Sequence, residues 1–144
     1  MDKYTPHRYA KEHNTNQQEI ADYMNATIWS VDSQATISEA AQLMDEKKIG
    51  SLLVKVNENY EGIITESDLT RRAVAKGLDP HNTKVSSVMT QPICSMDCHE
   101  PVTKANSVMA SNKVRHLAIT DDDKIVGILS VKDVVSFFSN PRLR

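Results

Sequence analysis

Residues 62–68 read GIITESD, and residues 127–133 repeat the pattern as GILSVKD. Each stretch has a glycine, two aliphatic residues, a hydroxyl residue, two variable positions and an aspartate. The pattern predicts a strand that opens on a glycine turn and runs into a helix. The hydroxyl residue stands at the junction, where it can cap the helix or face a phosphate, because free backbone N–H groups point outward there. The aspartate falls in the first helical turn, where the helix dipole favours a carboxylate that can accept two hydrogen bonds from a ribose diol.

The repeat extends well beyond this motif. A constant shift of 65 positions aligns residues 20–75 with residues 85–140 without a gap. A gapless match of this length predicts two copies of one supersecondary unit. Each copy has about sixty residues, which is marginal for an independent core, so we expect a compact pair in which each half covers the apolar face of the other.

Each copy is expected to follow the order strand, helix, strand, strand, helix, which is an α/β arrangement. In the first copy we expect a short lead-in helix at 19–24, an extended piece at 28–31, helices at 38–48 and 68–76, and strands at 49–56 and 60–65. In the second copy we expect helices at 102–112 and 132–139, and strands at 114–120 and 125–129. The chain then divides into a polar tail or arm at 1–18, a first domain at 19–77, a linker at 78–84, a second domain at 85–140 and a C-terminal tail at 141–144.

Composition restricts the partners and the compartment. The net charge is −2 and no basic tract occurs, so we expect no nucleic-acid partner. No apolar run reaches the roughly 20 residues that span a bilayer, so we expect no membrane partner. Residues 1–19 are polar and do not resemble a signal peptide. The two cysteines do not make a secreted disulfide framework, and these features together favour a cytoplasmic protein.

The tandem unit that closes each time on the motif of residues 62–68 and 127–133 resembles the cystathionine-β-synthase (CBS) domain. Two such units in series look like a CBS pair, also called a Bateman module. The resemblance covers residues from about 19 to 140. It implies two β-α-β-β-α repeats packed with pseudo-twofold symmetry, and a disk-like homodimer of the kind formed by stand-alone two-CBS proteins.

The family resemblance also implies a function. Such pairs bind AMP, ADP or ATP, and some bind NAD or S-adenosylmethionine, in two clefts between the copies. The ligand is a signal and not a required cofactor. The expected partners are therefore an adenine nucleotide, a second copy of the chain and an unidentified regulated protein. We expect no catalytic residue.

Carried over residue by residue, the resemblance implies two unequal sites. The cleft that ends on Asp133 would use the side chains of Ser130, Lys132, Arg115 and His116 near the phosphates. Its adenine wall would be formed by Trp29, Ile49 and Met24. The cleft that ends on Asp68 would use Thr65, Ser67, Gly50 and Ser51, with Cys94, Val114 and Met89 along the adenine. Because Gly50 and Ser51 stand where the other cleft has Arg115 and His116, we expect tighter binding at the Asp133 site.

Several of these residues have a simpler interpretation. The two aspartates can serve only as favourable acids of a first helical turn, and Thr65 and Ser130 only as helix caps. His116 and Trp29 can be ordinary core residues. Two other functions are therefore left open: a ligand-free protein-interaction module, and an enzyme that pairs His116 with Ser130 or Asp133. The enzyme is disfavoured because no third group is evident to orient the histidine.

Three residues near the start of the second repeat could bind a metal. Cys94, Cys98 and His99 offer three donors in the order C-x-x-x-C-H, but the sequence shows no fourth. We therefore expect no metal site and cysteines that pack as small apolar residues.

The last helix of each copy carries more apolar residues than one pair can cover. Phe137 and Phe138 are adjacent, so both cannot point into the same core. We expect one of them to face a second subunit in a homodimer, together with other apolar residues of the two helices, namely Leu69, Ala73, Val74, Val134 and Val135.

Overall fold

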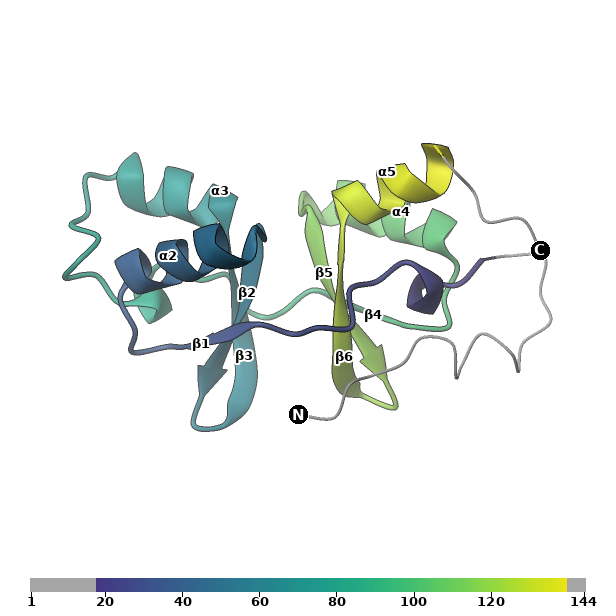
Figure 1. The fold of residues 1–144 in the computed structure, drawn as a ribbon, viewed down its shortest axis with the longest axis horizontal. Coiled ribbons are helices and arrows are strands. Elements are labelled where there is room, and N and C mark those ends of the chain that lie inside the picture. Colours follow the sequence, from purple (N-terminus) through teal and green to yellow (C-terminus); the bar gives the residue numbers. More distant parts are fainter. Residues whose placement is uncertain (1–17, 140–144) are drawn as a thin grey trace. The chain divides into compact units, whose positions relative to one another are not determined.

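The structure is a computed structural model that describes residues 18–139 as two compact units (Figure 1). The central unit is one continuous segment, residues 29–93, and the split unit combines residues 18–28 with residues 94–139. Each unit holds one three-stranded sheet and its own apolar core. The mixed α and β fold predicted from the repeat is confirmed. The predicted tails lie outside the described residues, apart from Gln18.

The two sheets have the same topology. In each, the first strand runs parallel to the second, and the second forms an antiparallel hairpin with the third. The central unit contains β1 (Ser30–Asp32), β2 (Ser51–Val56) and β3 (Asn59–Thr65). The split unit contains β4 (Ser95–Asp97), β5 (His116–Asp121) and β6 (Lys124–Ser130).

A helix connects the two parallel strands in each unit, α2 (Ile37–Lys47) in the central unit and α4 (Val102–Asn112) in the split unit. Helix α2 begins at a capping box: Thr36 Oγ1 accepts from the Glu39 amide at 3.1 Å, and the Glu39 carboxylate accepts from the Thr36 amide at 3.3 Å. Thr36 is therefore the N-cap of this helix. The helix ends at Lys48, whose φ of 56° is left-handed.

A second helix follows each hairpin. In the split unit it is α5 (Val131–Ser139). In the central unit it begins as α3 (Glu66–Asp68) and continues as the π-helical segment η2 (Leu69–Val74), so the regular helix predicted at 68–76 is only partly right. In the part of the chain that the structure describes, no helix is long and apolar enough to cross a membrane.

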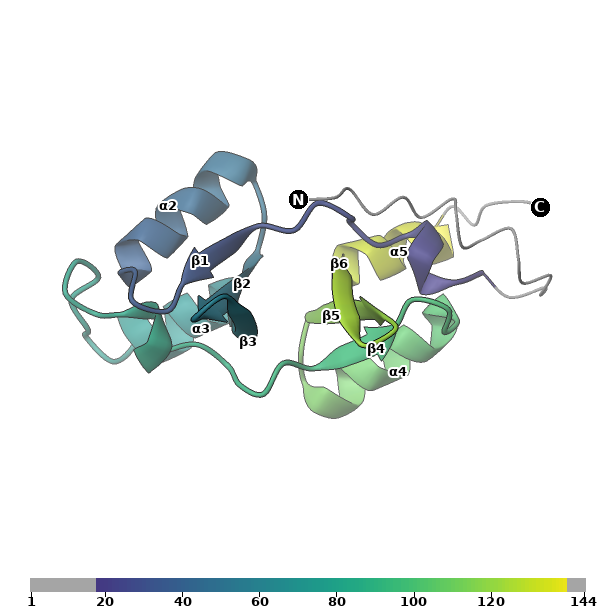
Figure 2. The same ribbon diagram turned by 90° about the horizontal axis from the view of Figure 1, so that it is seen from below.

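The first residues of each repeat pack on the sheet of the other repeat. Residues 18–28, the lead-in segment of the first repeat, contain the 3-10 helix η1 (Ile20–Asp22) and pack within the split unit (Figure 2). The amide of Ile20 donates to the carbonyl of Glu100 at 2.9 Å, and Asn25 forms a β-bridge with Ile128.

The equivalent lead-in segment of the second repeat packs within the central unit. It contains the 3-10 helix η3 (Val85–Ser87), and Thr90 forms a β-bridge with Ile63. Val88 and Met89 of this segment are buried in the central core, where each such side chain contributes about 1.5–3 kcal/mol. The sequence repeats and the compact units thus have different boundaries.

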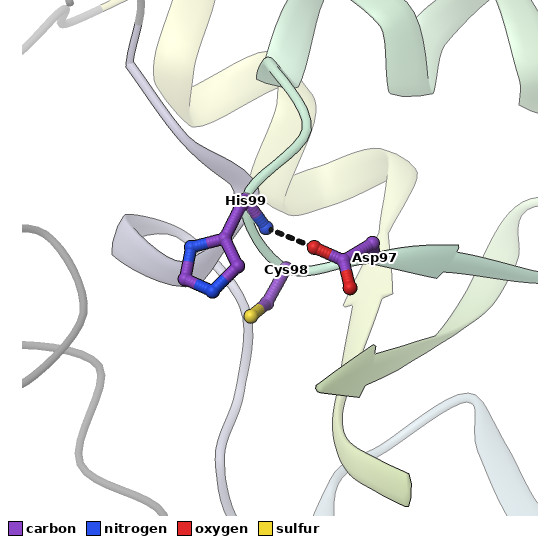
Figure 3. A group of neighbouring side chains, drawn as sticks. All are labelled: Asp97, Cys98 and His99. Atoms are coloured by element: carbon purple, nitrogen blue, oxygen red, sulfur yellow. Dashed lines mark hydrogen bonds between the residues drawn. The ribbon is translucent and has the colours of Figure 1, made fainter. Parts of the chain in front are cut away.

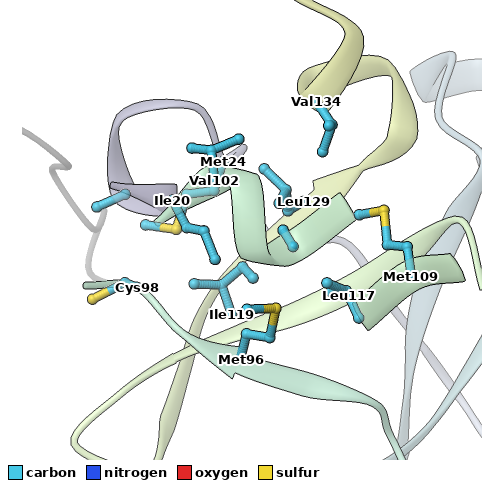
Figure 4. Close-up of a cluster of buried hydrophobic side chains, with 12 residues drawn as sticks. Ile20, Met24, Met96, Cys98, Val102, Met109, Leu117, Ile119, Leu129 and Val134 are labelled. Atoms are coloured by element: carbon cyan, nitrogen blue, oxygen red, sulfur yellow. The ribbon is translucent and has the colours of Figure 1, made fainter. Parts of the chain in front are cut away.

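The split core lies between the sheet, α4, α5 and the lead-in segment (Figure 4). Cys98 is fully buried in this core, and Cys94 packs partly buried against it. The turn that follows β4 is closed locally, because Asp97 Oδ1 accepts from the amide of His99 at 2.8 Å (Figure 3).

The motif glycines lie inside β3 and β6 and do not open a strand, which corrects the prediction. Their role is close approach. A Cβ on Gly62 would lie 2.7 Å from the Met89 sulfur, and one on Gly127 would lie 2.7 Å from the Met24 sulfur. Glycine at these positions leaves room for the lead-in segment to pair closely beside the strand.

Candidate functional site

The motif of the split unit ends in a capping box at the start of α5. Asp133 Oδ2 accepts from the amide of Ser130 at 2.8 Å and from its hydroxyl at 3.0 Å. In return, Ser130 Oγ accepts from the amide of Asp133 at 3.3 Å. The predicted capping role of Ser130 is therefore present. The capping bonds involve only Oδ2 of the Asp133 carboxylate. The other oxygen, Asp133 Oδ1, accepts no hydrogen bond from residues 18–139.

Several of the predicted residues lie at the same edge of the split sheet. His116 is paired with Ser130 across β5 and β6, and the carbonyl of Arg115 accepts from the amide of Val131 at 2.9 Å. Arg115 and Lys132 are exposed, and His116 is half-buried. The structure thus brings together the residues predicted to lie near the phosphates of the Asp133 site.

The motif of the central unit has the same capping box, but its aspartate is more engaged. Asp68 Oδ2 accepts from the amide of Thr65 at 3.0 Å and from its hydroxyl at 3.1 Å. Asp68 Oδ1 also accepts from the hydroxyl of Thr90 at 3.0 Å and lies 3.9 Å from a guanidinium nitrogen of Arg72. Asp68 is only 7% exposed. Both oxygens of this carboxylate are therefore occupied by protein groups.

Thr90 contacts the Asp68 carboxylate, a contact that the sequence did not predict. It belongs to the lead-in segment of the second repeat, and the shift of 65 places Asn25 at the equivalent position. Asn25 directs its side-chain oxygen to the amide of Thr27 at 2.9 Å. The sequence does show that the two repeats differ here, with a hydroxyl residue at 90 and an amide residue at 25. It does not show that Thr90 lies beside Asp68, because that depends on each lead-in segment joining the sheet of the other repeat.

The other predicted residues of the Asp68 site supply few cationic groups. Ser51 is buried and paired with Thr65 across β2 and β3, and Ser67 is exposed. The carbonyl of Gly50 accepts from the amide of Glu66 at 3.1 Å. Arg72, the nearest cation, donates to the carbonyl of Met89 at 2.8 Å. This end of the central unit is therefore built mainly from hydroxyls and backbone.

The residues predicted to line the adenine differ in how far they are buried. Trp29 is 37% exposed, and the ammonium of Lys47 lies 4.4 Å from the centroid of its ring, so a cation covers that face. Ile49 is half-buried against the central core. Met24 and Met89 are core residues over the motif glycines, with 7% and 8% exposure.

The remaining wall residues, Cys94 and Val114, pack half-buried against the split core. Burial raises the pKa of the Cys94 thiol above its usual range, so this cysteine carries little thiolate at neutral pH. Trp29 and Ile49 belong to the central unit, and Cys94 and Val114 to the split unit.

A model of the CBS domain family matches residues 20–75 and 85–140. The chain belongs to the CBS domain family. The resemblance that was read from the two motifs is thereby confirmed, and with it the assignment of the two sequence repeats to one kind of domain.

Individual relatives agree with this assignment. The CBS domain-containing protein YhcV of Bacillus subtilis is 31% identical over 115 residues, which cover 80% of this chain and 81% of the relative. An uncharacterised conserved protein from Pyrococcus horikoshii has a crystal structure with a TM-score of 0.81 and 31% identity, covering 89% of this chain and 96% of its own.

A third neighbour is Hypoxic Response Protein I, whose crystal structure holds two coordinated zinc ions. It has a TM-score of 0.68 and 26% identity, and the match covers 82% of this chain and 97% of the neighbour. CBS domain pairs are regulatory modules for which nucleotide binding is typical, and they are not typically enzymes. The ends of the two motifs, at Asp68 and Asp133, are therefore the candidate sites for a regulatory ligand.

Proposed function

We propose that this protein is a regulatory module that binds an adenosine nucleotide, with its tighter site at Asp133. One observation carries the proposal: Asp133 Oδ1, at the start of a helix, receives no donor from residues 18–139, whereas the equivalent oxygen of Asp68 is bound by Thr90. A carboxylate oxygen in that position suits a ribose hydroxyl, which can donate to it.

The surrounding charge supports a phosphate-bearing ligand. Arg115 can bind a phosphate in bidentate fashion, and Lys132 adds an ammonium near the same helix start. AMP, ADP and ATP fit this set, and NAD and S-adenosylmethionine share the adenosine part. The bound ligand would report to a regulated protein, and the module would act as a homodimer in the cytoplasm.

The test is calorimetric titration of the purified chain with AMP, ADP, ATP, NAD and S-adenosylmethionine. Asp133→Asn keeps an oxygen that can accept the capping bonds from Ser130 and removes the charge. We expect its affinity for the preferred ligand to fall at least about tenfold, because a hydrogen bond to a charged group is worth about 1.5–3 kcal/mol.

Asp68→Asn is the matched control, and it should leave the tighter binding phase nearly unchanged. Binding that is equal in wild type and Asp133→Asn would show that the ligand site has been misassigned. Wild-type protein that binds none of the five ligands would instead favour the ligand-free interaction module. Turnover of bound nucleotide over hours would favour the enzyme.

A further inference from the structure

The turn between β4 and α4 gathers three side chains that can bind metals. Asp97, Cys98 and His99 each offer one donor atom that lies within 4.8 Å of the other two (Figure 3). The turn itself is fixed, because Asp97 Oδ1 accepts from the amide of His99 and the Asp97 amide donates to Glu100 at 3.2 Å. The convergence of these three side chains is therefore built into the local backbone.

Two carboxylates from distant parts of the sequence face the two ring nitrogens of His99. Glu19 Oε2, from the lead-in segment, lies 3.4 Å from Nδ1 of His99, and Asp121 Oδ1, at the end of β5, lies 3.7 Å from Nε2. The Glu19 side chain is only 5% exposed and the Asp121 side chain 18%, whereas the His99 side chain is 30% exposed. A buried carboxylate such as Glu19 is costly unless a donor or a cation faces it.

All five residues belong to the split unit, and neighbouring backbone bonds hold them in place. Glu19 forms a β-bridge with Pro101, and the amide of Cys98 donates to the carbonyl of Thr120 at 2.8 Å. The sequence showed no fourth donor because Glu19 and Asp121 reach the turn only through the fold.

The donor atoms lie near the spacing of a tetrahedral ion, and binding would draw them closer together. With zinc bonds of about 2.0 Å to nitrogen or oxygen and 2.3 Å to sulfur, two nitrogen or oxygen ligands on one ion are about 3.3 Å apart, and a sulfur and a nitrogen or oxygen ligand about 3.5 Å apart. The separation of 3.7 Å between His99 Nε2 and Asp121 Oδ1 is too long for a hydrogen bond and slightly longer than the spacing of two such ligands. Thiolate, imidazole and carboxylate together are the ligands that zinc accepts.

We propose that this cluster binds one zinc ion through Asp97, Cys98 and His99 Nε2, with Asp121, 3.7 Å from Nε2, moving in as the fourth ligand. Glu19 then accepts a hydrogen bond from Nδ1 of His99, which fixes the tautomer and presents Nε2 to the ion. The ion would tie the lead-in segment, the β4–α4 turn and the end of β5 together. It would act as a structural clamp on the split unit, separate from the motif ends that serve the proposed nucleotide.

The test uses tag-free, nucleotide-free full-length chain that has been stripped with a chelator. Zinc uptake is measured by elemental analysis after dialysis, and the thermal midpoint is followed as zinc is added. We expect one zinc per chain and a midpoint that rises with zinc concentration, since a ligand of the folded state stabilises it. Cobalt loading should give a thiolate-to-metal charge-transfer band.

His99→Ala should abolish uptake and the cobalt band, and it should fold because its side chain is partly exposed. Cys98→Ala should remove the thiolate band, whereas Cys94→Ala and Asp122→Asn are matched controls that should retain full uptake. Glu19→Gln should weaken zinc affinity about 10–100-fold, as changes to such outer partners do.

The alternative is a protonated His99 that simply bridges Glu19 and Asp121. It predicts that wild type takes up no more zinc than His99→Ala. That result would overturn the proposal, as would a thiolate band that survives in folded Cys98→Ala and disappears in Cys94→Ala.

Discussion

Thr90 donates its hydroxyl to Oδ1 of Asp68 at 3.0 Å, although the two residues come from different sequence repeats. The bond occupies the carboxylate oxygen that its counterpart, Asp133, leaves without a protein donor in residues 18–139. One hydroxyl in an exchanged lead-in segment thus makes the two motif ends chemically different.

Removing that hydroxyl should make the weaker site stronger. Thr90→Val keeps the side-chain shape and frees Asp68 Oδ1, so we expect nucleotide affinity in the weaker calorimetric phase to rise about 2–10-fold, the worth of one hydrogen bond. The free energy of unfolding should fall by about 1 kcal/mol because Asp68 is buried. An unchanged weak phase would mean that Asp68 does not meet the ligand.

Arg115 should discriminate ligands by their phosphates. Arg115→Ala should lower affinity for ATP at least about tenfold, because it removes a charge-assisted contact worth about 1.5–3 kcal/mol, and should leave adenosine binding nearly unchanged. The measurement is competition between ATP and adenosine. Lys124→Ala, an exposed lysine at the β5–β6 turn, is the control. Equal losses for ATP and adenosine would argue for a role of Arg115 in folding.

Alanine at the motif glycines should destabilise the protein to different extents. On Gly127 a Cβ would meet the Asn25 carbonyl at 2.9 Å as well as the Met24 sulfur, whereas on Gly62 the nearest carbonyl, that of Thr90, is 3.2 Å away. A sulfur can move but a backbone carbonyl cannot, so Gly127→Ala should cost about 1–3 kcal/mol and Gly62→Ala less. Urea denaturation measures both losses, and the reverse order would contradict the closer backbone approach at Gly127.

Substitutions of the two phenylalanines of α5 should have different effects, one on the free energy of unfolding and the other on homodimer formation. Phe137 packs against Tyr23 with ring centroids 5.3 Å apart, whereas Phe138 is 56% exposed. Phe138→Ser should change the free energy of unfolding by less than about 0.5 kcal/mol, and Phe137→Ser by at least about 1 kcal/mol. If the predicted homodimer uses this helix, sedimentation of Phe138→Ser should show dissociation at concentrations where wild type is dimeric. A wild type that sediments as a monomer would remove the dimer altogether.

The sequence was sufficient to predict the architecture because hydrophobic periodicity within each element and the repeat between the two halves can both be read directly from the sequence. They predicted the two hairpins, the helix over α2 and the capping role of Thr65 and Ser130. They could not predict the exchange of lead-in segments, because alignment of Val85 with Ile20 establishes equivalence but not the sheet that each one joins.

The same limit applies to the chemistry of the sites. The importance of Thr90 and the proximity of Glu19 to His99 both depend on which sheet a lead-in segment joins. The π-helical turn after Asp68 also escaped prediction, since residues 69–74 have an ordinary helical pattern of apolar residues.

The unit of duplication and the unit of folding in this chain are out of phase. Residues 20–75 and 85–140 repeat one unit and form two sheets, yet each sheet takes its lead-in segment from the opposite copy. A fragment cut at the linker of residues 78–84 would leave Val88 and Met89 without the core they fill. Recombination that preserves folding must instead cut near residues 28 and 93, where one module can be exchanged as an insertion within the other.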